Sequence, residues 1–421
     1  MTARPVAERS RARNGPFRLA IVATHPVQYF APLYRALAER SDLTVFFAHR
    51  ATPQQQAAAG FGTAFEWDVD LTAGFRHVFL DNIAQTPDAT TFKGCDTPRI
   101  GAHLAEGAFD AVMTTGWYTR THLQTVLACR RQRRPVLVRS DSQLGYQPSR
   151  LKRAVKRFAY PVLLRAFDGV ITVGTRSRAF LTHHAYPPAR IFHAPHAIDT
   201  ARFAAGAASE AGRAVRAAAG LADDQRVVLF AGKLLPFKRP LDVVEAVSRL
   251  DPDGRTAVLV AGSGPLEAAM RARAEALGVP LHILGFVNQS RMPAAYAAAD
   301  VLVLPSTGRE TWGLVTNEAL ASGTPVIVSD AAGAAPDIAA DGHVGRTFRG
   351  GDIADLAATL GAVFAAPPSA AEITAVSDRF SLARAAEGIL AAARACAHVP
   401  EPREMAGDVA GLPLPAAQRA M

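Results

Sequence analysis

The sequence predicts an α/β protein of two domains, each built around a parallel β-sheet. Short apolar runs alternate with helical patterns from residue 17 to about residue 200, and the same alternation starts again after Ala205. Strands that alternate with helices are typical of parallel α/β sheets. The chain has 421 residues, which is too long for one domain of ordinary size. We therefore expect two α/β domains joined near residues 200–220.

The first domain is expected to contain the earlier apolar runs. The first run breaks at Thr24-His25-Pro26, and a helical pattern follows around Ala31–Arg40. Residues 49–100 are rich in Gly, Thr and Phe and give no clear pattern. The strands expected in this domain are Phe17–Ala23, Leu43–Ala48, Ala111–Thr114, Pro135–Val138 and Gly169–Val173.

The second domain is expected to repeat this architecture. Phe380–His398 has the pattern of an amphipathic helix. The expected strands are Arg226–Phe230, Thr256–Val260, Leu281–Leu284, Val301–Leu304 and Val326–Val328. The expected division of the chain is a flexible basic tail at 1–16, a first domain at 17–200, a second domain at 201–398 and a disordered tail at 399–421.

The composition is that of an ordinary globular protein with a basic surface. Hydrophobic residues make up 49% of the chain and charged residues 20%, and the formal net charge is +9. Such a charge favours anionic partners, which include nucleic acid, anionic lipid and phosphorylated substrates. The three cysteines are widely spaced, no apolar run is long enough to cross a membrane, and residues 1–18 lack the apolar region of a secretory signal. We therefore expect a cytoplasmic protein.

The most informative segment contains two glutamates, Glu310 and Glu318, flanked by two apolar strand-like runs. Glu318 is expected to open a helix that ends near Ser322-Gly323. If most of the spacer is helical, the two carboxylates lie roughly 12 Å apart along the helix axis. With a helix N-terminus between them, they suit a ligand that has hydroxyl groups at both ends and an anionic centre. A nucleotide sugar has this layout of sugar, diphosphate and ribose.

A second segment, Phe230–Pro240, follows an expected strand and opens a helix. It places Lys233 and Lys238 at the carboxyl end of that strand, which is the edge where ligands bind in open α/β sheets. Alone, such a segment is more often a solvated basic loop. Next to the two glutamates, a diphosphate site is the favoured interpretation.

These two segments resemble the motifs of retaining glycosyltransferases of the family-4 type, also called group 1, which have the GT-B fold. The resemblance implies two Rossmann-like domains that face each other across a cleft, with a nucleoside-diphosphate sugar on the second domain and the acceptor on the first. It also implies that the final helix crosses back to the first domain. Glu310 would then bind the donor sugar, and Glu318 the ribose. Lys233, Lys238 and the amides near Gly313-Leu314 would neutralise the leaving diphosphate. Lys233 stands where the family usually has Arg, so it lacks the bidentate fork of a guanidinium.

Other segments resemble donor-side motifs of the same family. Gly232 belongs to the segment that resembles the family's G-R/K-x(n)-K motif, and Ala261–Pro265 resembles its G-x-G-P turn. The backbone of Phe286 and Val287 would face the nucleotide base. Pro195–Phe203 resembles the interdomain segment and supports a boundary near residue 200.

Three features of the first domain concern the acceptor side. The turn after the first strand lacks the glycines that the family often has there, so His25 is expected to face the acceptor or the donor sugar, or else to be structural. Many relatives carry a His after the strand at Pro135–Val138, and Asp141 is expected to take its role here. Trp117-Tyr118 either pack against a sugar or belong to the core.

A basic helical segment, Arg150–Phe167, has apolar residues on one face. Related enzymes often act on lipid-linked acceptors. A peripheral contact with the inner face of the membrane is therefore one interpretation of this segment, and a solvated surface helix is the other.

The resemblance implies transfer to a glycan, a lipid-linked or a small-molecule acceptor, in polysaccharide or glycoconjugate synthesis, without a metal. Asp68-Val-Asp70 matches the metal-binding D-x-D pattern of transferases with another fold, but the surrounding motifs are missing. Two alternatives remain open. One is a sugar-nucleotide 2-epimerase of the same fold. The other is a basic nucleic-acid-binding protein, although the sequence has no helix-turn-helix, RNP or zinc motif and we expect no nucleic acid partner.

Overall fold

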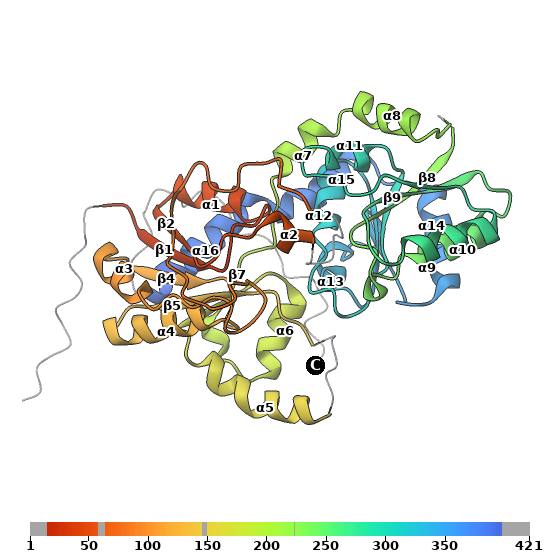
Figure 1. The fold of residues 1–421 in the computed structure, drawn as a ribbon. Coiled ribbons are helices and arrows are strands. Elements are labelled where there is room, and N and C mark those ends of the chain that lie inside the picture. The colour runs from red at the N-terminus through yellow and green to blue at the C-terminus, as the bar shows by residue number, and fades with distance from the viewer. Residues whose placement is uncertain (1–14, 58–63, 145–149, 223, 398–421) are drawn as a thin grey trace, which may run out of the picture.

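The computed structural model describes residues 15–57, 64–144, 150–222 and 224–397. Within these residues the chain forms two lobes, each with its own parallel sheet (Figure 1). The fold class predicted from the sequence is therefore confirmed. Most of the tails expected at 1–16 and 399–421 lies outside the described residues.

The first lobe contains a seven-stranded sheet with the order β3-β2-β1-β4-β5-β6-β7, and all its strand pairs are parallel. Two apolar layers cover its two faces, as expected for a parallel sheet that is buried on both sides. The strands are β1 (Arg18–Ala23), β2 (Asp42–Phe47), β3 (Arg76–Phe79), β4 (Ala111–Thr114), β5 (Val136–Ser140), β6 (Gly169–Thr172) and β7 (Ile191–His193).

The second lobe contains a six-stranded sheet with the order β10-β9-β8-β11-β12-β13, again with parallel pairs. Apolar layers also cover both of its faces. The strands are β8 (Arg226–Ala231), β9 (Thr256–Ala261), β10 (Leu281–Ile283), β11 (Val301–Leu304), β12 (Val326–Ser329) and β13 (Gly345–Phe348).

The helices follow the strands in the alternation that the sequence predicts. Those up to the end of the first sheet are α1 (Ala31–Ala38), α2 (Pro53–Gln56), α3 (Ile100–Gly107), α4 (Arg120–Gln132), α5 (Arg150–Leu164) and α6 (Thr175–His183). Those that follow are α7 (Thr200–Gly206), α8 (Ser209–Ala218), α9 (Leu241–Leu250), α10 (Glu267–Leu277), α11 (Met292–Ala297), α12 (Val315–Ala321), α13 (Ala335–Ile338), α14 (Ile353–Ala365), α15 (Ala370–Ser377) and α16 (Leu382–Ala397).

The last helix, α16, leaves the second lobe and packs on the first sheet (Figure 1). Its residues Ala385, Ile389 and Ala393 are buried in the same apolar layer as Leu19 and Leu137 of the first sheet. The small alanine side chains let the helix lie close to the strands. The chain therefore crosses between the lobes twice, once after β7 and once before α16.

Three strands were missed in the sequence prediction: β3, β7 and β13. Each is the outermost strand of its sheet and pairs on one side only. Edge strands carry polar residues, as Arg76 and His77 of β3 and Arg346 of β13 show. The apolar signal used to find strands is therefore weakest at these positions.

The described residues contain no helix that is both long enough and apolar enough to cross a membrane.

Candidate active site

The carboxyl ends of β8 and β11 bring the predicted basic and acidic residues together. Lys238 follows β8, and its Nζ donates a hydrogen bond to Glu310 Oε2 in the loop after β11. Both side chains are only 14% exposed, so this ion pair is largely shielded from solvent. Ser306 Oγ donates a second hydrogen bond to the same carboxylate oxygen, at 3.1 Å. The lysine that the resemblance assigns to the diphosphate and the glutamate that it assigns to the donor sugar are thus direct partners.

Lys233 stands next to this pair. Burial lowers the pKa of its ammonium group, and the positive charge of Lys238 lowers it further, whereas Glu310 raises it. Two lysines and one carboxylate therefore share a half-buried site at the sheet edge. The excess positive charge is the electrostatic condition for binding an anion there.

Glycines allow two turns to cross closely beside these lysines. A Cβ on Gly262 would lie 1.9 Å from the carbonyl oxygen of Gly232. Gly232 also has φ of 141°, a region that favours glycine. Its amide donates to Ala261 at 2.9 Å, which ties the turn after β8 to the end of β9. This crossing fixes the backbone that carries Lys233.

Glu318 is buried in α12, with 8% of its surface exposed. Tyr296 Oη donates to Glu318 Oε2 at 2.6 Å. Burial raises the pKa of Glu318 from 4.5 to about 7, although the hydrogen bond from Tyr296 and the charge of Arg202 act in the opposite direction.

The expectation that Glu318 opens a helix is wrong, because α12 begins at Val315. Of the spacer between the two glutamates, only Val315, Thr316 and Asn317 are helical, so the premise of the 12 Å separation also fails. The reason lies at Gly313, which has φ of 100°. A Cβ there would meet Leu304 Cδ2 at 2.3 Å. The turn at Gly313 folds the chain back over β11, and Leu314 then becomes the N-cap of α12.

The loop expected to frame the nucleotide base lies against a segment of the first lobe. The ring of Phe286 is 4.0 Å from that of Phe65, centroid to centroid. Beyond Val287, Asn288 Nδ2 donates to the carbonyl of Glu66 at 2.7 Å, and Ser290 N donates to Asp68 Oδ1 at 3.1 Å. Residues 65–68 therefore cover part of the expected base-binding loop.

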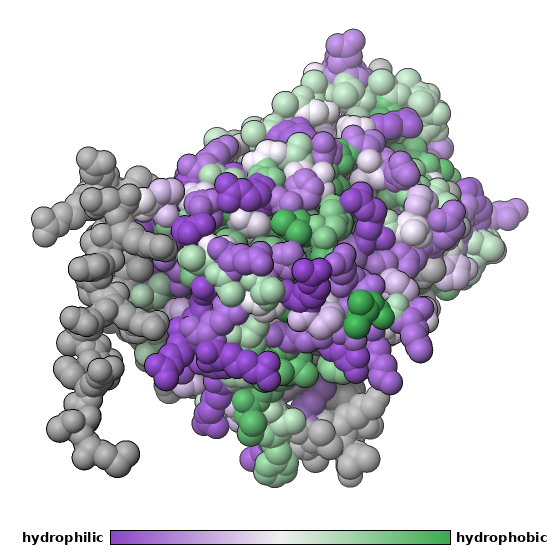
Figure 2. All heavy atoms as spheres, turned by 60° about the vertical axis from the view of Figure 1, so that its left-hand side comes forward, coloured by the Kyte–Doolittle hydropathy of each residue, from purple (hydrophilic) through white to green (hydrophobic). Residues whose placement is uncertain are grey.

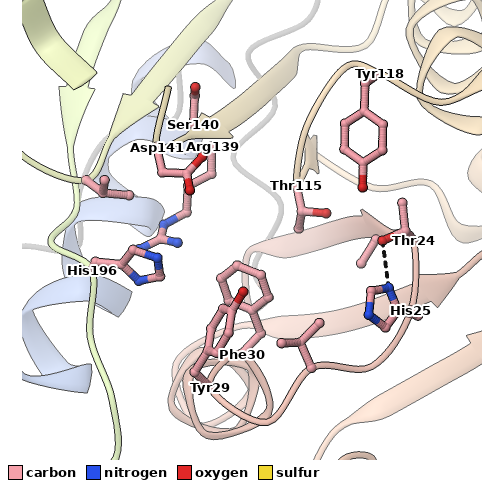
Figure 3. Close-up of a pocket in the computed structure, with 13 residues that line it drawn as sticks. Thr24, His25, Tyr29, Phe30, Thr115, Tyr118, Arg139, Ser140, Asp141 and His196 are labelled. Atoms are coloured by element: carbon pink, nitrogen blue, oxygen red, sulfur yellow. Dashed lines mark hydrogen bonds between the residues drawn. The ribbon is translucent and has the colours of Figure 1, made fainter. Parts of the chain in front are cut away.

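A cavity of about 230 Å³ lies at the carboxyl edge of the first sheet, where β1, β4 and β5 end (Figure 3). His25 lines it, and its Nδ1 is 3.0 Å from Thr24 Oγ1. Burial, followed by the nearby His49, lowers the pKa of His25 to about 4, so its ring is neutral at physiological pH. Tyr118 lines the same cavity, whereas Trp117 packs against the apolar layer beneath the sheet.

Two contacts from the loop after β5 join this cavity to Glu310. Thr311 Oγ1 donates to Asp141 Oδ2 at 2.7 Å. Gln143 Nε2 donates to the carbonyl oxygens of Gly308 at 3.0 Å and of Glu310 at 2.6 Å. Asp141 also lines the cavity. The predicted acceptor-side residues, His25 and Asp141, therefore share one cavity that adjoins the loop of Glu310.

Sequence reasoning missed one charged residue in this cavity, Arg139. The expected strand ended at Val138, but β5 continues to Ser140, so Arg139 is part of the sheet. Its side chain is 6% exposed. An arginine that continues a buried strand directly after an apolar run is unusual in a core, and that contrast is the signal that would have identified it.

The two aspartates of the D-x-D pattern have separate partners. Asp68 accepts from Ser290 of the second lobe, whereas Asp70 accepts from the amides of Thr72 and Ala73 in its own turn. Among the described residues, no three His, Cys, Asp or Glu side chains are arranged to hold a metal ion.

The chain is similar to known proteins both in sequence and in fold. Residues 213–375 match the family model of glycosyl transferases group 1. A D-inositol 3-phosphate glycosyltransferase of Mycolicibacterium vanbaalenii is 33% identical over 241 residues, which cover 53% of this chain and 51% of the relative. The chain thus spans about half the length of the curated relatives that it matches.

Solved structures show the likeness over a longer stretch. Anabaena Alr3699/HepE, in complex with UDP, superposes with a TM-score of 0.68 at 17% identity, covering 89% of this chain and 99% of that one. A glycosyltransferase of Rickettsia africae gives a TM-score of 0.66 at 14% identity, covering 90% and 98%.

These matches, with the two parallel-sheet lobes, define a protein of the GT-B fold. The match to the model of glycosyl transferases group 1 covers most of the second lobe, from residue 213 to residue 375.

Proposed function

We propose that this protein is a retaining glycosyltransferase that moves a sugar from a nucleoside-diphosphate sugar to an acceptor bound on the first lobe. The observation that carries the proposal is the buried pair of Lys238 and Glu310, which lies next to Lys233 at the carboxyl edge of the second sheet. The match of residues 213–375 to the family supports the reaction type. The UDP bound to Anabaena Alr3699/HepE supports a nucleoside diphosphate as the leaving group.

The ion pair suggests how donor binding and sugar positioning are coupled. A diphosphate that reaches Lys238 competes with Glu310 for the same ammonium group. Glu310, released from that lysine, can then accept hydrogen bonds from the hydroxyl groups of the donor sugar. Lys233 and Lys238 would stabilise the negative charge that develops on the leaving diphosphate, which is the electrostatic form of catalysis. No divalent metal is needed in this scheme.

Asp141 is proposed to orient the acceptor hydroxyl. It lines the first-lobe cavity and accepts a hydrogen bond from Thr311, next to Glu310 in sequence. A reacting hydroxyl held near Asp141 would thus lie close to the donor sugar, and this proximity lowers the entropic part of the barrier. Glu318, in the helix beyond, is proposed to bind the ribose.

The acceptor is proposed to be a glycan, a lipid-linked or a small molecule, used in the synthesis of polysaccharides or glycoconjugates. A lipid-linked acceptor is supported by helix α5, where Phe158 is 75% and Val162 is 71% exposed. These residues are four positions apart and share one helix face, and Lys156 and Arg157 lie beside them. Figure 2 shows apolar surface at the lower edge of the molecule, at the height of α5 in Figure 1, amid hydrophilic surface. This pattern suits a peripheral contact with an anionic membrane.

The experiment that tests the proposal begins with a thermal-shift panel of nucleotide sugars, because a ligand that binds the folded state raises the melting temperature. The stabilising donor is then incubated with and without extracted glycan and lipid-linked acceptors, and the nucleoside diphosphate that is released is measured. Release that depends on the acceptor, with a product whose anomeric configuration by NMR equals that of the donor, is the expected result.

Two outcomes would contradict the proposal. A sugar nucleotide inverted at C2 without any acceptor would indicate a 2-epimerase of the same fold. An inverted anomeric configuration in the product would contradict retention. A Glu310→Gln variant serves as the matched control, since it keeps the size of the side chain and removes the charge that pairs with Lys238.

A further inference from the structure

Arg139 is a buried cation that the proposed reaction does not use. Its side chain is 6% exposed, and it lines the first-lobe cavity together with His25 and Asp141. Its Nη2 donates to the carbonyl oxygen of Pro195 at 3.0 Å. Its Nε is buried and has no hydrogen-bond partner among the residues that the structure describes. Burying a charged group with an unpaired hydrogen-bond donor lowers the stability of the folded protein unless another interaction compensates for the lost hydration.

The protein itself supplies little compensation for this charge. Within residues 15–57, 64–144, 150–222 and 224–397, no carboxylate forms an ion pair with Arg139. Asp141 is the acidic group that acts on it through space, and Oδ2 of that carboxylate accepts from Thr311. The ring of Phe30 lies 5.7 Å from the guanidinium carbon, a distance at which a cation–π contact is weak. Burial lowers the pKa of Arg139 to about 10, so the guanidinium remains charged at neutral pH.

Apart from the carboxylate of Asp141, the polar groups that line the cavity with Arg139 are neutral hydrogen-bonding groups. His25 is neutral because its pKa is about 4, and burial also holds the pKa of His196 well below its usual value. Tyr29 and Thr115 add hydroxyl groups. Figure 3 shows the guanidinium beside the His196 ring and near the rings of Tyr29 and Phe30, on the side of the cavity where β5 ends. A buried positive charge beside neutral donors is suited to a single oxyanion, and Oδ2 of Asp141, the acidic group of the cavity, already accepts from Thr311.

We propose that Arg139 binds a carboxylate or phosphate group of the acceptor, so that the acceptor of this enzyme is anionic. The inference rests on the proposed glycosyl transfer and adds the chemical class of its second substrate. The cavity of about 230 Å³ is smaller than typical sites for drug-sized ligands, so it suits one sugar-sized group. Asp141, two residues further along the same chain, would face the hydroxyl that attacks, while Arg139 holds the anion.

The structural alternative is that Arg139 serves only to hold Pro195, in the segment between the lobes. That role accounts for Nη2 but leaves Nε without a function. The two roles differ in their consequences for stability. If Arg139 is kept for a ligand, replacing it with an apolar side chain of similar length removes a desolvated charge and should not lower the melting temperature.

The test uses the intact protein with saturating UDP and isothermal titration calorimetry. The probes are glucose, glucose 6-phosphate, glucuronate and inorganic phosphate, titrated into wild type, Arg139→Met and Arg139→Lys. The matched control is Arg134→Met. Arg134 is a partly buried arginine of the first lobe. Like Arg139 it donates to a backbone carbonyl, that of Leu104, but it is outside the lining of the cavity.

The expected result is that the anionic probes bind wild type and Arg134→Met better than glucose does. In Arg139→Met their affinity should fall about 10- to 100-fold, the loss expected for hydrogen bonds to a charged group. Arg139→Lys should retain part of the binding, because it keeps the charge but not the guanidinium geometry. The melting temperature of Arg139→Met and its affinity for UDP should equal those of wild type.

Three outcomes would overturn the inference. Anionic probes that bind Arg139→Met as well as they bind wild type would show that the guanidinium does not hold them. If wild type binds UDP but binds none of the anionic probes at millimolar concentration, the anionic acceptor is refuted and the proposed function stays intact. UDP-glucuronate is also titrated into the same variants in place of UDP, and a loss in Arg139→Met that affects UDP-glucuronate but none of the other probes would place the anion on the donor sugar instead. Failure of UDP itself to bind would contradict the proposed function.

Discussion

The buried carboxyl of Glu318 leads to a quantitative prediction about pH. Its pKa rises from 4.5 to about 7 in the folded protein, mainly because burial disfavours the charged form. An acid whose folded pKa lies above its unfolded pKa keeps its proton longer in the folded state. The folded state is then the one that binds more protons between these two values, so the free energy of unfolding falls as pH rises through this window.

The magnitude follows from the two pKa values. A difference from 4.5 to about 7 corresponds to about 3 kcal/mol when the window is crossed completely. Between about pH 5 and about pH 8 the loss is about 2.5 kcal/mol. A Glu318→Gln variant stays neutral at every pH and cannot lose this contribution. Its stability relative to wild type should therefore rise by about 2.5 kcal/mol over the same interval.

The assay is equilibrium urea unfolding of both proteins at the two pH values. The change in unfolding free energy between the two pH values is compared for the two proteins, so that the contribution of every group that titrates alike in both cancels. Tyr296→Phe is the matched control. Tyr296 donates the hydrogen bond that lowers the pKa of Glu318, so its removal should raise that pKa and enlarge the pH dependence. Equal pH dependence in wild type and Glu318→Gln would refute the assignment of a buried, proton-retaining carboxyl.

Three further predictions concern the reaction and its location. Lys238→Ala should reduce turnover by about 10- to 100-fold, whereas Asp70→Ala should leave turnover nearly unchanged, because the proposal places only the lysine at the leaving group. Steady-state kinetics with the identified donor check this prediction, and similar losses in both variants would refute it. EDTA should leave turnover nearly unchanged, and loss of activity that manganese restores would contradict the metal-free scheme. A variant with Phe158→Ser and Val162→Ser should sediment less with anionic liposomes than wild type does, since both side chains are exposed on α5. Equal recovery of the wild-type protein with neutral and with anionic vesicles would argue against the electrostatic part of the contact.

The sequence predicted those parts of the fold that depend on local patterns. Strands in the middle of each sheet are nearly continuous apolar runs, so β8 and β9 were expected within one residue of where they lie. The edge strands β3, β7 and β13 carry polar residues, and hydrophobicity alone does not distinguish them from loops. The start of α12 was misplaced because the turn at Gly313 is set by a contact with Leu304, which sequence spacing does not reveal.

The sequence predicted which residues belong to the candidate site, but it did not predict which of them contact one another. Lys238 and Glu310 are 72 positions apart, and Asp141 and Thr311 are 170 apart, so only the folded sheets bring them together. The role of Arg139 was missed for a related reason. Its position in β5 depends on the packing around it, and so does the lack of a partner for its Nε within the described part of the chain.

The central claim is that a nucleoside diphosphate binds beside Lys233, Lys238 and Glu318 without a metal. Isothermal titration calorimetry of UDP and GDP with the intact protein in EDTA tests it most directly, with Lys238→Ala compared in parallel. We predict that at least one of the two nucleotides binds wild type in EDTA and binds Lys238→Ala about 10- to 100-fold more weakly. No binding of either nucleotide at millimolar concentration, or equal affinity in the variant, would contradict the account.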